Sequence, residues 1–429
     1  MLPPLAPDQF DVGSTEDSLE RLVRAASSCG DLFRIHAPGR QSDTWIINNP
    51  VDIKRVLVTN HRNFTKGVGL DRVKILLGNG IMTSEGALWR SQRRMIQPLF
   101  HRRVIEQYAG LIATSVDGLI ARWQTFADRG EPVNVTDEMS ELTLDIVLHS
   151  IFGRDLAWLA EQMGGNAFAL VTEHSARDLQ FAYRFRLLSR HIEELLARRR
   201  ANGEDHFDFL GMLMAARDKQ TGEPMTDRDL IDETLTLVVA GHETTASALN
   251  WAWYLLAKNP AAQDRLGAEL DAIPLTTPMS FQQAEELHYT QAVLQEAMRL
   301  YPPGWILSRR TIDEDIFSGY RVPPGTDVML SPYLIQRHPG HWDAPESFRP
   351  ERFLDAASDP RDQWIYIPFA AGPRHCVGES FAMYEMTVHM SRVARRWRLE
   401  YLDDGPLDIE AAINLRTRRS LRMRLLPRH

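Results

Sequence analysis

The sequence predicts a mainly α-helical protein with a smaller β-sheet region. Residues 104–200 are almost entirely helical in their apolar spacing, and Asp229 to Lys258 forms one further long helical pattern. Short extended runs bounded by Pro and Gly turns predict β-rich parts at about residues 31–60, 301–335 and 405–429. No Pro/Ser/Gly-rich linker divides the 429 residues, so we expect a single domain spanning 1–429.

The composition is that of an ordinary globular protein, with 44% hydrophobic and 25% charged residues and a net charge of −8. This acidic balance argues against a nucleic-acid-binding protein. The chain has two cysteines, so we expect no disulfide and a reducing compartment. It has no run of about 18 apolar residues and no signal-peptide pattern near Met1. We therefore expect a cytoplasmic protein without a membrane span.

The N-terminal part is expected to alternate between short helices and strands. A helix is predicted at about residues 15–26, followed by strands at Leu32–Ile35 and Thr44–Ile47 and a short helix at 50–59. Residues 67–80 mix apolar side chains with glycines, and we expect an irregular stretch there. Near the other end, residues 411–415 and 421–425 suggest a final hairpin.

One cysteine, Cys376, lies in a Gly/Pro-rich loop directly before a helical pattern that begins at Glu379. Glycine allows close backbone approach, so the sulfur could face a large flat group. The helix N-terminus and the nearby Arg374 both favour a thiolate, which is a strong axial ligand for heme iron. The alternatives are a small buried cysteine in a turn, and a Cys/His zinc site with His375, although the usual paired spacing is absent.

The long helical pattern carries a second unusual segment, Ala240 to Thr245. The residues before it are apolar on nearly all sides, which indicates a buried helix. A glycine and an acid are unfavourable there, and such conflicts often mark functional sites. Cleavage of dioxygen requires two protons, which a hydroxyl backed by an acid can relay; Glu243 and Thr244 are therefore candidates, and Gly241 could open room for oxygen. The alternative is a threonine-bearing bend in a core helix.

The cysteine loop resembles the heme-ligand loop of the cytochrome P450 family, Phe-x-x-Gly-x-Arg-x-Cys-x-Gly, at Phe369, Gly372, Arg374, Cys376 and Gly378. The resemblance implies the cytochrome P450 fold and a thiolate-ligated heme b. It also implies that these five positions bind the cofactor and that Cys376 is the metal ligand.

A second motif of the same family lies on the long helix. Residues 240–244 are similar to the Ala/Gly-Gly-x-Asp/Glu-Thr motif at each position. The resemblance implies that Thr244 is the oxygen-contacting hydroxyl and that Glu243 is the acid. His242 is not part of the motif and is expected to be structural.

Two further segments are expected to reach the heme propionates. Trp89 and Arg93 lie four residues apart on a predicted helix and resemble the family motif Trp-x-x-x-Arg; an arginine fork suits a carboxylate. Without the resemblance, such a pair is typical of a surface contact. The chain later leaves a helix at Pro302, and the family pattern then implies Arg309 as a propionate ligand, with Arg310 as the alternative.

A structural triad is expected on the cysteine side of the heme. Glu296 and Arg299 are three residues apart on a helix, close enough to pair. They resemble the family motif Glu-x-x-Arg, which ties to an arginine in a Pro-Glu-Arg-Phe segment. That segment is present at residues 350–353, so the resemblance implies Arg352 as the third member.

The activity that the resemblance implies is monooxygenation of a hydrophobic small molecule, for which a terpenoid or steroid is the first expectation and a fatty acid the second. Apolar pockets accept many shapes, so no single residue selects among these classes. The substrate-facing candidates are Leu70, Val73, Leu235, Val239, Ala240, Trp305 and Ile306.

Electrons are expected from a separate ferredoxin or flavodoxin with its reductase, because the chain has no Gly-rich flavin or nicotinamide motif. A basic cluster near Trp89 would face such an acidic partner; it comprises Arg90, Arg94, Arg102 and Arg103. Two alternatives remain. A peroxide-using or isomerising relative would need no partner, and a heme-based sensor would not need Glu243 and Thr244.

Overall fold

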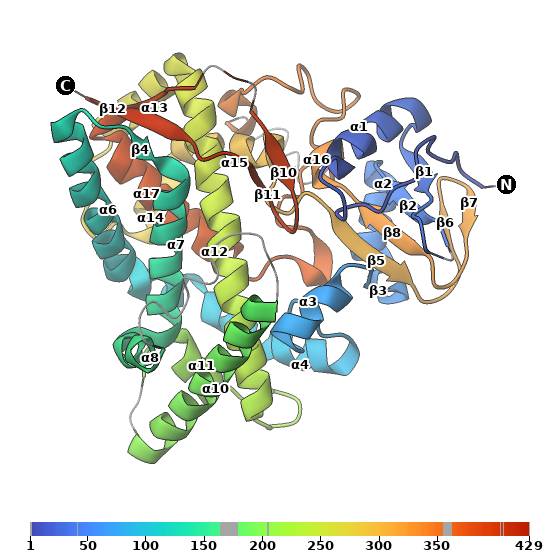
Figure 1. Cartoon of the computed structure of the whole chain (residues 1–429), viewed down its shortest axis with the longest axis horizontal. Coiled ribbons are helices and arrows are strands. Elements are labelled where there is room, and N and C mark those ends of the chain that lie inside the picture. Colours follow the sequence, from blue (N-terminus) through green and yellow to red (C-terminus); the bar gives the residue numbers. More distant parts are fainter. Residues whose placement is uncertain are drawn as a thin grey trace.

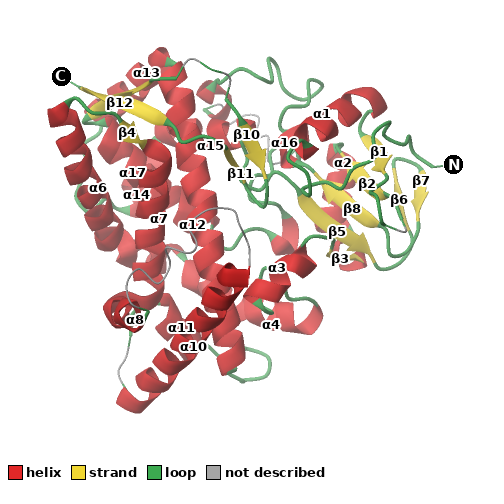
Figure 2. Cartoon of the chain, viewed as in Figure 1, coloured by secondary structure: helices red, strands yellow, loops and turns green. Residues whose placement is uncertain are grey.

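A computed structural model describes residues 2–40, 42–163, 179–203, 206–354, 363–403, 405 and 407–428. Helices fill most of the molecule, and a smaller β-rich part lies at one side, next to the N-terminus (Figure 2). The predicted fold class, mainly α with a smaller β region, is confirmed. Among the helices of these residues, none has the length and apolar character needed to cross a membrane.

The helices of the described residues are drawn in Figure 1, coloured along the sequence. They are α1 (Ser18–Cys29), α2 (Pro50–Lys54), α3 (Leu70–Leu77), α4 (Gly86–Ile96), α5 (Arg102–Ile105), α6 (Ala109–Arg129), α7 (Val135–Phe152), α8 (Leu156–Gln162), α10 (Leu179–Asn202), α11 (Phe209–Ala215), α12 (Asp227–Lys258), α13 (Pro260–Ala272), α14 (Phe281–Glu286), α15 (His288–Leu300), α16 (Pro332–Ile335) and α17 (Glu379–Ala394).

The largest sheet has the strand order β1-β2-β8-β5-β3, in which β2 and β8 are parallel and the other neighbours antiparallel. Smaller sheets have the orders β4-β12-β9, β6-β7 and β10-β11. The strands are β1 (Leu32–Ile35), β2 (Thr44–Ile47), β3 (Phe64–Lys66), β4 (Val133–Asn134), β5 (Leu307–Thr311), β6 (Asp315–Phe317), β7 (Tyr320–Val322), β8 (Asp327–Leu330), β9 (Trp397–Tyr401), β10 (Ile409–Ala411), β11 (Leu415–Thr417) and β12 (Arg422–Pro427).

The prediction of an irregular stretch at residues 67–80 is wrong, because α3 forms within it. Gly69 and Gly78 flank this helix with φ of +96° and +64°, so the glycines bound the helix and do not interrupt it. Val73 and Leu77 are four residues apart and contact the main core on one face. The two N-terminal strands, in contrast, have the predicted bounds.

The expected C-terminal hairpin forms with different strands. Ala411 and Leu415 face each other across the β10-β11 hairpin, so residues 411–415 span its turn. The last strand, β12, pairs with β9 and β4. The pattern predicted extended structure correctly but not its partners, since partners depend on residues far away in the sequence.

Helix α12 runs through the middle of the molecule (Figure 1). A capping box sets its start: Thr226 Oγ1 accepts a bond from the Asp229 backbone N–H at 3.2 Å, and the Asp229 carboxylate accepts one from the Thr226 N–H at 3.1 Å. Most of the helix is buried against α7 and α15. Its central position explains why the residues just before Ala240 are apolar on nearly all sides.

Candidate active site

The cysteine loop is closed by backbone hydrogen bonds. The Cys376 N–H donates to the Phe369 carbonyl at 2.9 Å, and the His375 N–H donates to the Gly372 carbonyl at 3.0 Å. Gly372 has φ of +71°, and a Cβ atom there would lie 2.1 Å from the Leu57 carbonyl oxygen. Only glycine fits this position, so the first loop glycine is required by the fold itself.

Cys376 lies just before α17, with its side chain exposed although many protein atoms surround it. Desolvation by these atoms raises the pKa of the Cys376 thiol, and the Glu379 carboxylate adds to this effect. The backbone amide of Gly378 and the Arg93 guanidinium lower the pKa. The net effect raises the thiol pKa; the helix N-terminus counteracts this as the sequence predicts, but the arginine that does so is Arg93, whereas the sequence predicted Arg374 in that role.

Arg93 and Trp89 both lie on α4 and reach the cysteine loop. Arg93 Nη1 donates to the His375 carbonyl at 2.8 Å. Arg374 in turn lies over the Trp89 ring, 5.3 Å from its centroid. The structure therefore brings both members of the Trp-x-x-x-Arg motif to the cysteine loop, Arg93 directly and Trp89 through Arg374.

A buried positive charge lies beside this group. Arg309 is 8% exposed, and its Nη1 donates only to the Ser308 carbonyl at 2.8 Å; no described carboxylate pairs with it. Burial, followed by the charge of Arg374, lowers the pKa of Arg309 to about 10. Burial and the same charge lower the pKa of Lys66 to about 7. Among the described carboxylates, only Glu85 forms an ion pair with Arg374.

The cations near Cys376 outnumber the carboxylates, and this excess tests whether the residues present fit a heme. A buried cation without a partner is unfavourable, and a dianionic group with two carboxylates, such as heme, would neutralise it. The guanidinium fork of Arg309 also suits a carboxylate. The residues present therefore fit heme.

The choice between the two adjacent arginines follows from strand geometry. Successive side chains of a strand point to opposite faces, and Arg310 points away from Arg309. It forms a two-point ion pair with Asp327, at 2.9 and 3.0 Å. Arg309 is thus the member placed with Arg374 and Lys66.

The predicted catalytic pair lies half-buried in the middle of α12. Thr244 Oγ1 donates to the Ala240 carbonyl at 2.7 Å, one turn earlier. Glu243 Oε2 accepts a bond from Asn414 Nδ2 at 2.7 Å. The two side chains are adjacent in sequence but have separate partners.

The neighbouring residues of this segment face α7. His242 is 2% exposed, its Nε2 lies 3.0 Å from Ser140 Oγ, and burial lowers its pKa to about 4, in keeping with a structural role. A Cβ atom on Gly241 would lie 2.9 Å from Val147 Cγ2. This glycine therefore permits close contact between α12 and α7.

The substrate-facing candidates divide into two groups. In the first group, Leu70, Val73, Val239 and Ile306 are half-buried, and Ala240 is exposed. Leu235 is 2% exposed within the main core, and Trp305 is 0% exposed within the core near the N-terminus. The indole N–H of Trp305 donates to the Ala412 carbonyl at 2.9 Å. These two side chains pack the protein, contrary to expectation, because enclosed side chains cannot contact a ligand.

The expected basic cluster is partly neutralised. Arg94 pairs with Asp218 at 2.6 Å, and Arg102 pairs with Glu285 at 3.0 Å. The other two members, Arg90 and Arg103, are exposed and have no ion-pair partner within the described part of the chain.

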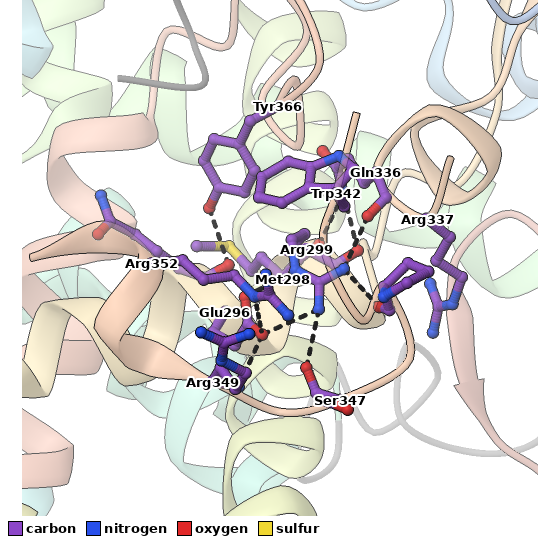
Figure 3. A network of polar contacts seen from close by, with 12 residues as sticks. Glu296, Met298, Arg299, Gln336, Arg337, Trp342, Ser347, Arg349, Arg352 and Tyr366 are labelled. Atoms are coloured by element: carbon purple, nitrogen blue, oxygen red, sulfur yellow. Dashed lines mark hydrogen bonds and ion pairs between the residues drawn. The ribbon is translucent and has the colours of Figure 1, made fainter. Parts of the chain in front are cut away.

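The structural triad forms a buried network (Figure 3). Arg299 donates to both carboxylate oxygens of Glu296, at 2.7 and 2.9 Å, and both side chains are 0% exposed. Arg352 Nε donates to the same carboxylate at 3.3 Å. Gln336 extends the network, since its amide donates to the Arg299 carbonyl at 3.1 Å and its oxygen accepts from the Ile367 N–H at 2.9 Å. Ile367 leads into the cysteine loop, so α15 supports that loop.

Three residues near the site have no sequence signal. Lys66 ends an edge strand, Glu85 precedes α4, and Asn414 lies at a hairpin turn. Each is an ordinary polar residue in its local sequence. Their roles follow only from contacts with residues far away in the chain.

Comparisons with known proteins agree with this geometry. The family model "Cytochrome P450" matches residues 4–188 and 167–421. Cyclooctatin synthase of Streptomyces melanosporofaciens is 33% identical over 390 residues, covering 86% of this chain and 83% of the relative. A cyclooctat-9-en-7-ol 5-monooxygenase of the same organism is 32% identical with the same coverage. Pentalenene oxygenase of Streptomyces avermitilis is 29% identical over 422 residues, covering 95% and 92%. The chain belongs to the cytochrome P450 family of heme-thiolate monooxygenases.

Proposed function

We propose that this monooxygenase hydroxylates a cyclic terpenoid. The names of the relatives support this substrate class, because one acts on cyclooctat-9-en-7-ol and another on pentalenene. The half-buried apolar side chains of α3 and α12, including Val73 and Val239, suit such a hydrophobic molecule. A steroid is the next candidate and a fatty acid the third.

The observation that carries the proposal is Cys376 together with the buried Arg309, with which no described carboxylate pairs. We assign the metal-ligand role to Cys376 and the propionates of heme b to Trp89, Arg93, Arg309 and Arg374. Phe369, Gly372 and Gly378 shape the loop. Lys66 lies near Arg309 and Arg374, but its Nζ donates to the Ile81 and Ser84 carbonyls, both at 2.8 Å, so we assign it no propionate.

When bound, heme supplies activated dioxygen, of which one atom enters a substrate C–H bond and the other leaves as water with two electrons and two protons. The chain's own residues must deliver those protons. Thr244 provides a hydroxyl and Glu243 a carboxylate on adjacent positions of α12, which suits a relay through water. Val239 and Ala240, one turn earlier, would face the substrate.

A ferredoxin or flavodoxin with its reductase is the proposed electron source. Arg90 and Arg103, the exposed members of the basic cluster, would contact its acidic surface. A peroxide-using relative is the second candidate, since the pairing of Arg94 and Arg102 leaves this surface less basic than the sequence indicates. Turnover with peroxide alone, compared with turnover on a reductase chain, distinguishes the two.

The pairing of β2 with β8 and of β3 with β5 joins distant segments into one sheet. This supports the further proposal that residues 1–429 form a single domain.

The test of the substrate class is an optical titration of the purified ferric holoenzyme. The panel contains pentalenene, cyclooctat-9-en-7-ol, a steroid and a long-chain fatty acid. A saturable high-spin shift with a cyclic terpenoid, but not with the fatty acid, is expected. A shift with the fatty acid alone would contradict the proposal, and a protein that binds no heme would contradict the assignment of Cys376.

A further inference from the structure

The β10-β11 hairpin lies along one face of α12 (Figure 1). Four side chains of the helix make hydrogen bonds to it, namely Glu243, Ser247, Asn250 and Trp251. Their spacing of four, three and one residues places them on a single helix face. This polar face of α12 therefore contacts the hairpin.

Three of these residues fix the register of the hairpin on the helix. Ser247 Oγ and Trp251 Nε1 both donate to the Leu415 carbonyl, at 2.6 and 3.1 Å. Asn250 Nδ2 donates to Thr417 Oγ1 at 3.1 Å. Leu415 is fully buried, so these bonds lie away from water, where removing one partner is costly.

The other side of the hairpin is held by the segment before β5. The Leu415 N–H donates to the Pro303 carbonyl at 3.0 Å, and Trp305 Nε1 donates to the Ala412 carbonyl at 2.9 Å. A turn bond runs from the Ala412 N–H to the Asn414 carbonyl at 3.2 Å. The residue at the turn, Asn414, is thus fixed from both sides, which also explains why Trp305 is buried.

Asn414 directs its side-chain amide to the candidate acid, with 2.7 Å between Nδ2 and Glu243 Oε2. No other side chain of the described residues donates to Glu243, and Thr244 bonds to its own helix. A neutral amide orients a carboxylate without pairing its charge, and it leaves the second oxygen open for water or a proton. A lysine or arginine at the turn would instead hold the carboxylate ionised.

We propose that Asn414 is a positioning residue that holds the Glu243 carboxylate in the orientation from which it passes protons to dioxygen. The proposal rests on the proposed function of Glu243. It gives the hairpin a role in oxygen cleavage, because the fixed turn sets the direction of the acid on α12.

The test compares wild-type holoenzyme with Asn414→Ala, driven by NADH, a ferredoxin and its reductase. The probe is pentalenene, or whichever panel compound gives the larger high-spin shift. The amount of product formed per dioxygen consumed should fall about tenfold, because a hydrogen bond to a charged group contributes about that factor to an equilibrium. The dioxygen that is consumed without forming product should appear as hydrogen peroxide, whose formation takes two electrons and two protons. The Kd of the probe should stay within about twofold of the wild-type value.

A readout independent of activity is a crystal structure of the Asn414→Ala variant. The Glu243 carboxylate should leave its wild-type orientation while the hairpin backbone stays in place. An unchanged carboxylate, or a product yield within about twofold of wild type, would overturn the proposal.

The matched control is Glu410→Gln on the same hairpin. It removes the cross-strand ion pair between Glu410 and Arg416, 2.9 Å in length, without touching α12. This variant should retain the wild-type product yield. An equal loss in both variants would mean that hairpin stability, and not the orientation of Glu243, determines the yield.

Two further variants separate this inference from the function on which it rests. If Glu243→Gln forms product with the wild-type yield, Glu243 is not the proton donor and both proposals fail. If Glu243→Gln loses yield but Asn414→Ala does not, only the positioning role fails. The double variant should equal Glu243→Gln alone, because Asn414 acts through Glu243; additive losses would contradict this.

Discussion

Arg93 on α4 donates through Nη1 to the carbonyl oxygen of His375 at 2.8 Å, and His375 immediately precedes Cys376. One side chain thus fixes the backbone beside the sulfur and places a positive charge near it. The charge counteracts the burial that raises the thiol pKa. This hydrogen bond therefore holds helix α4 against the cysteine loop, although about 280 residues separate them in the sequence.

Replacing the unpaired cation, Arg309→Leu, should weaken heme binding and stabilise the heme-free protein. The buried guanidinium has no described carboxylate partner, so its removal relieves an electrostatic cost in the absence of propionates. Heme titration of the apoprotein and urea unfolding of the same sample measure both effects. The control is Arg310→Leu, which breaks the pair with Asp327 and should leave heme affinity near the wild-type value. Equal heme affinity in both variants would contradict the assignment of Arg309.

The two loop glycines should respond differently to alanine. Gly372→Ala places a Cβ atom 2.1 Å from the Leu57 carbonyl at a positive φ, so we expect a loss of about 2 kcal/mol or more in the free energy of unfolding. Gly378→Ala meets Phe100 at 3.7 Å, an ordinary contact, and should leave the apoprotein as stable as wild type. Urea unfolding of both apoproteins measures this difference. Equal destabilisation of the two variants would show that the close contact and positive φ at Gly372 do not determine the loss of stability.

The buried network on α15 should be sensitive to loss of charge. Glu296→Gln leaves Arg299 buried without its counter-ion, which typically costs about 3–5 kcal/mol. The control is Glu314→Gln, whose pair with Arg321 is exposed and should change stability by about 0–1 kcal/mol. Urea unfolding curves followed by circular dichroism measure both variants. A small loss of stability in Glu296→Gln would mean that the hydrogen bonds from Arg299 to backbone carbonyls are enough to stabilise the buried guanidinium without the carboxylate.

Glu233 should make stability depend on pH. Burial raises the pKa of Glu233 to about 8 from an ordinary value of 4.5, although the Ile81 N–H, which bonds to it at 2.9 Å, lowers the pKa. The folded protein then holds a proton that the unfolded chain has released. Its contribution to stability is complete below pH 4.5 and is lost as the pH rises toward 8, by about 1.4 kcal/mol per pH unit.

The variant Glu233→Gln should therefore gain stability relative to wild type as the pH rises from about 5 to about 8. By the same linkage, the difference in free energy of unfolding should grow by about 1.4 kcal/mol per pH unit. Urea unfolding at several pH values measures the difference. The exposed Glu141→Gln on α7 is the control and should show no such trend. A constant difference between Glu233→Gln and wild type across this range would contradict the prediction.

The sequence by itself determined the cysteine loop, the long helix α12 and the first two strands. These features have local causes: glycine and proline restrict the backbone, and apolar periodicity identifies a buried face. The spacing of Glu296 and Arg299 on one helix likewise allowed their pairing to be predicted. The helix α3 was missed because its flanking glycines resemble those of an irregular loop.

Tertiary structure alone decided which side chains meet. Strand orientation separated Arg309 from Arg310, and packing against the hairpin buried Trp305, which the sequence placed beside the substrate. The bond between Asn414 and Glu243 joins residues 171 apart in sequence. No local pattern encodes such contacts, because they depend on how α12, the hairpin and the sheet pack together, and that packing is fixed only when the whole core is buried.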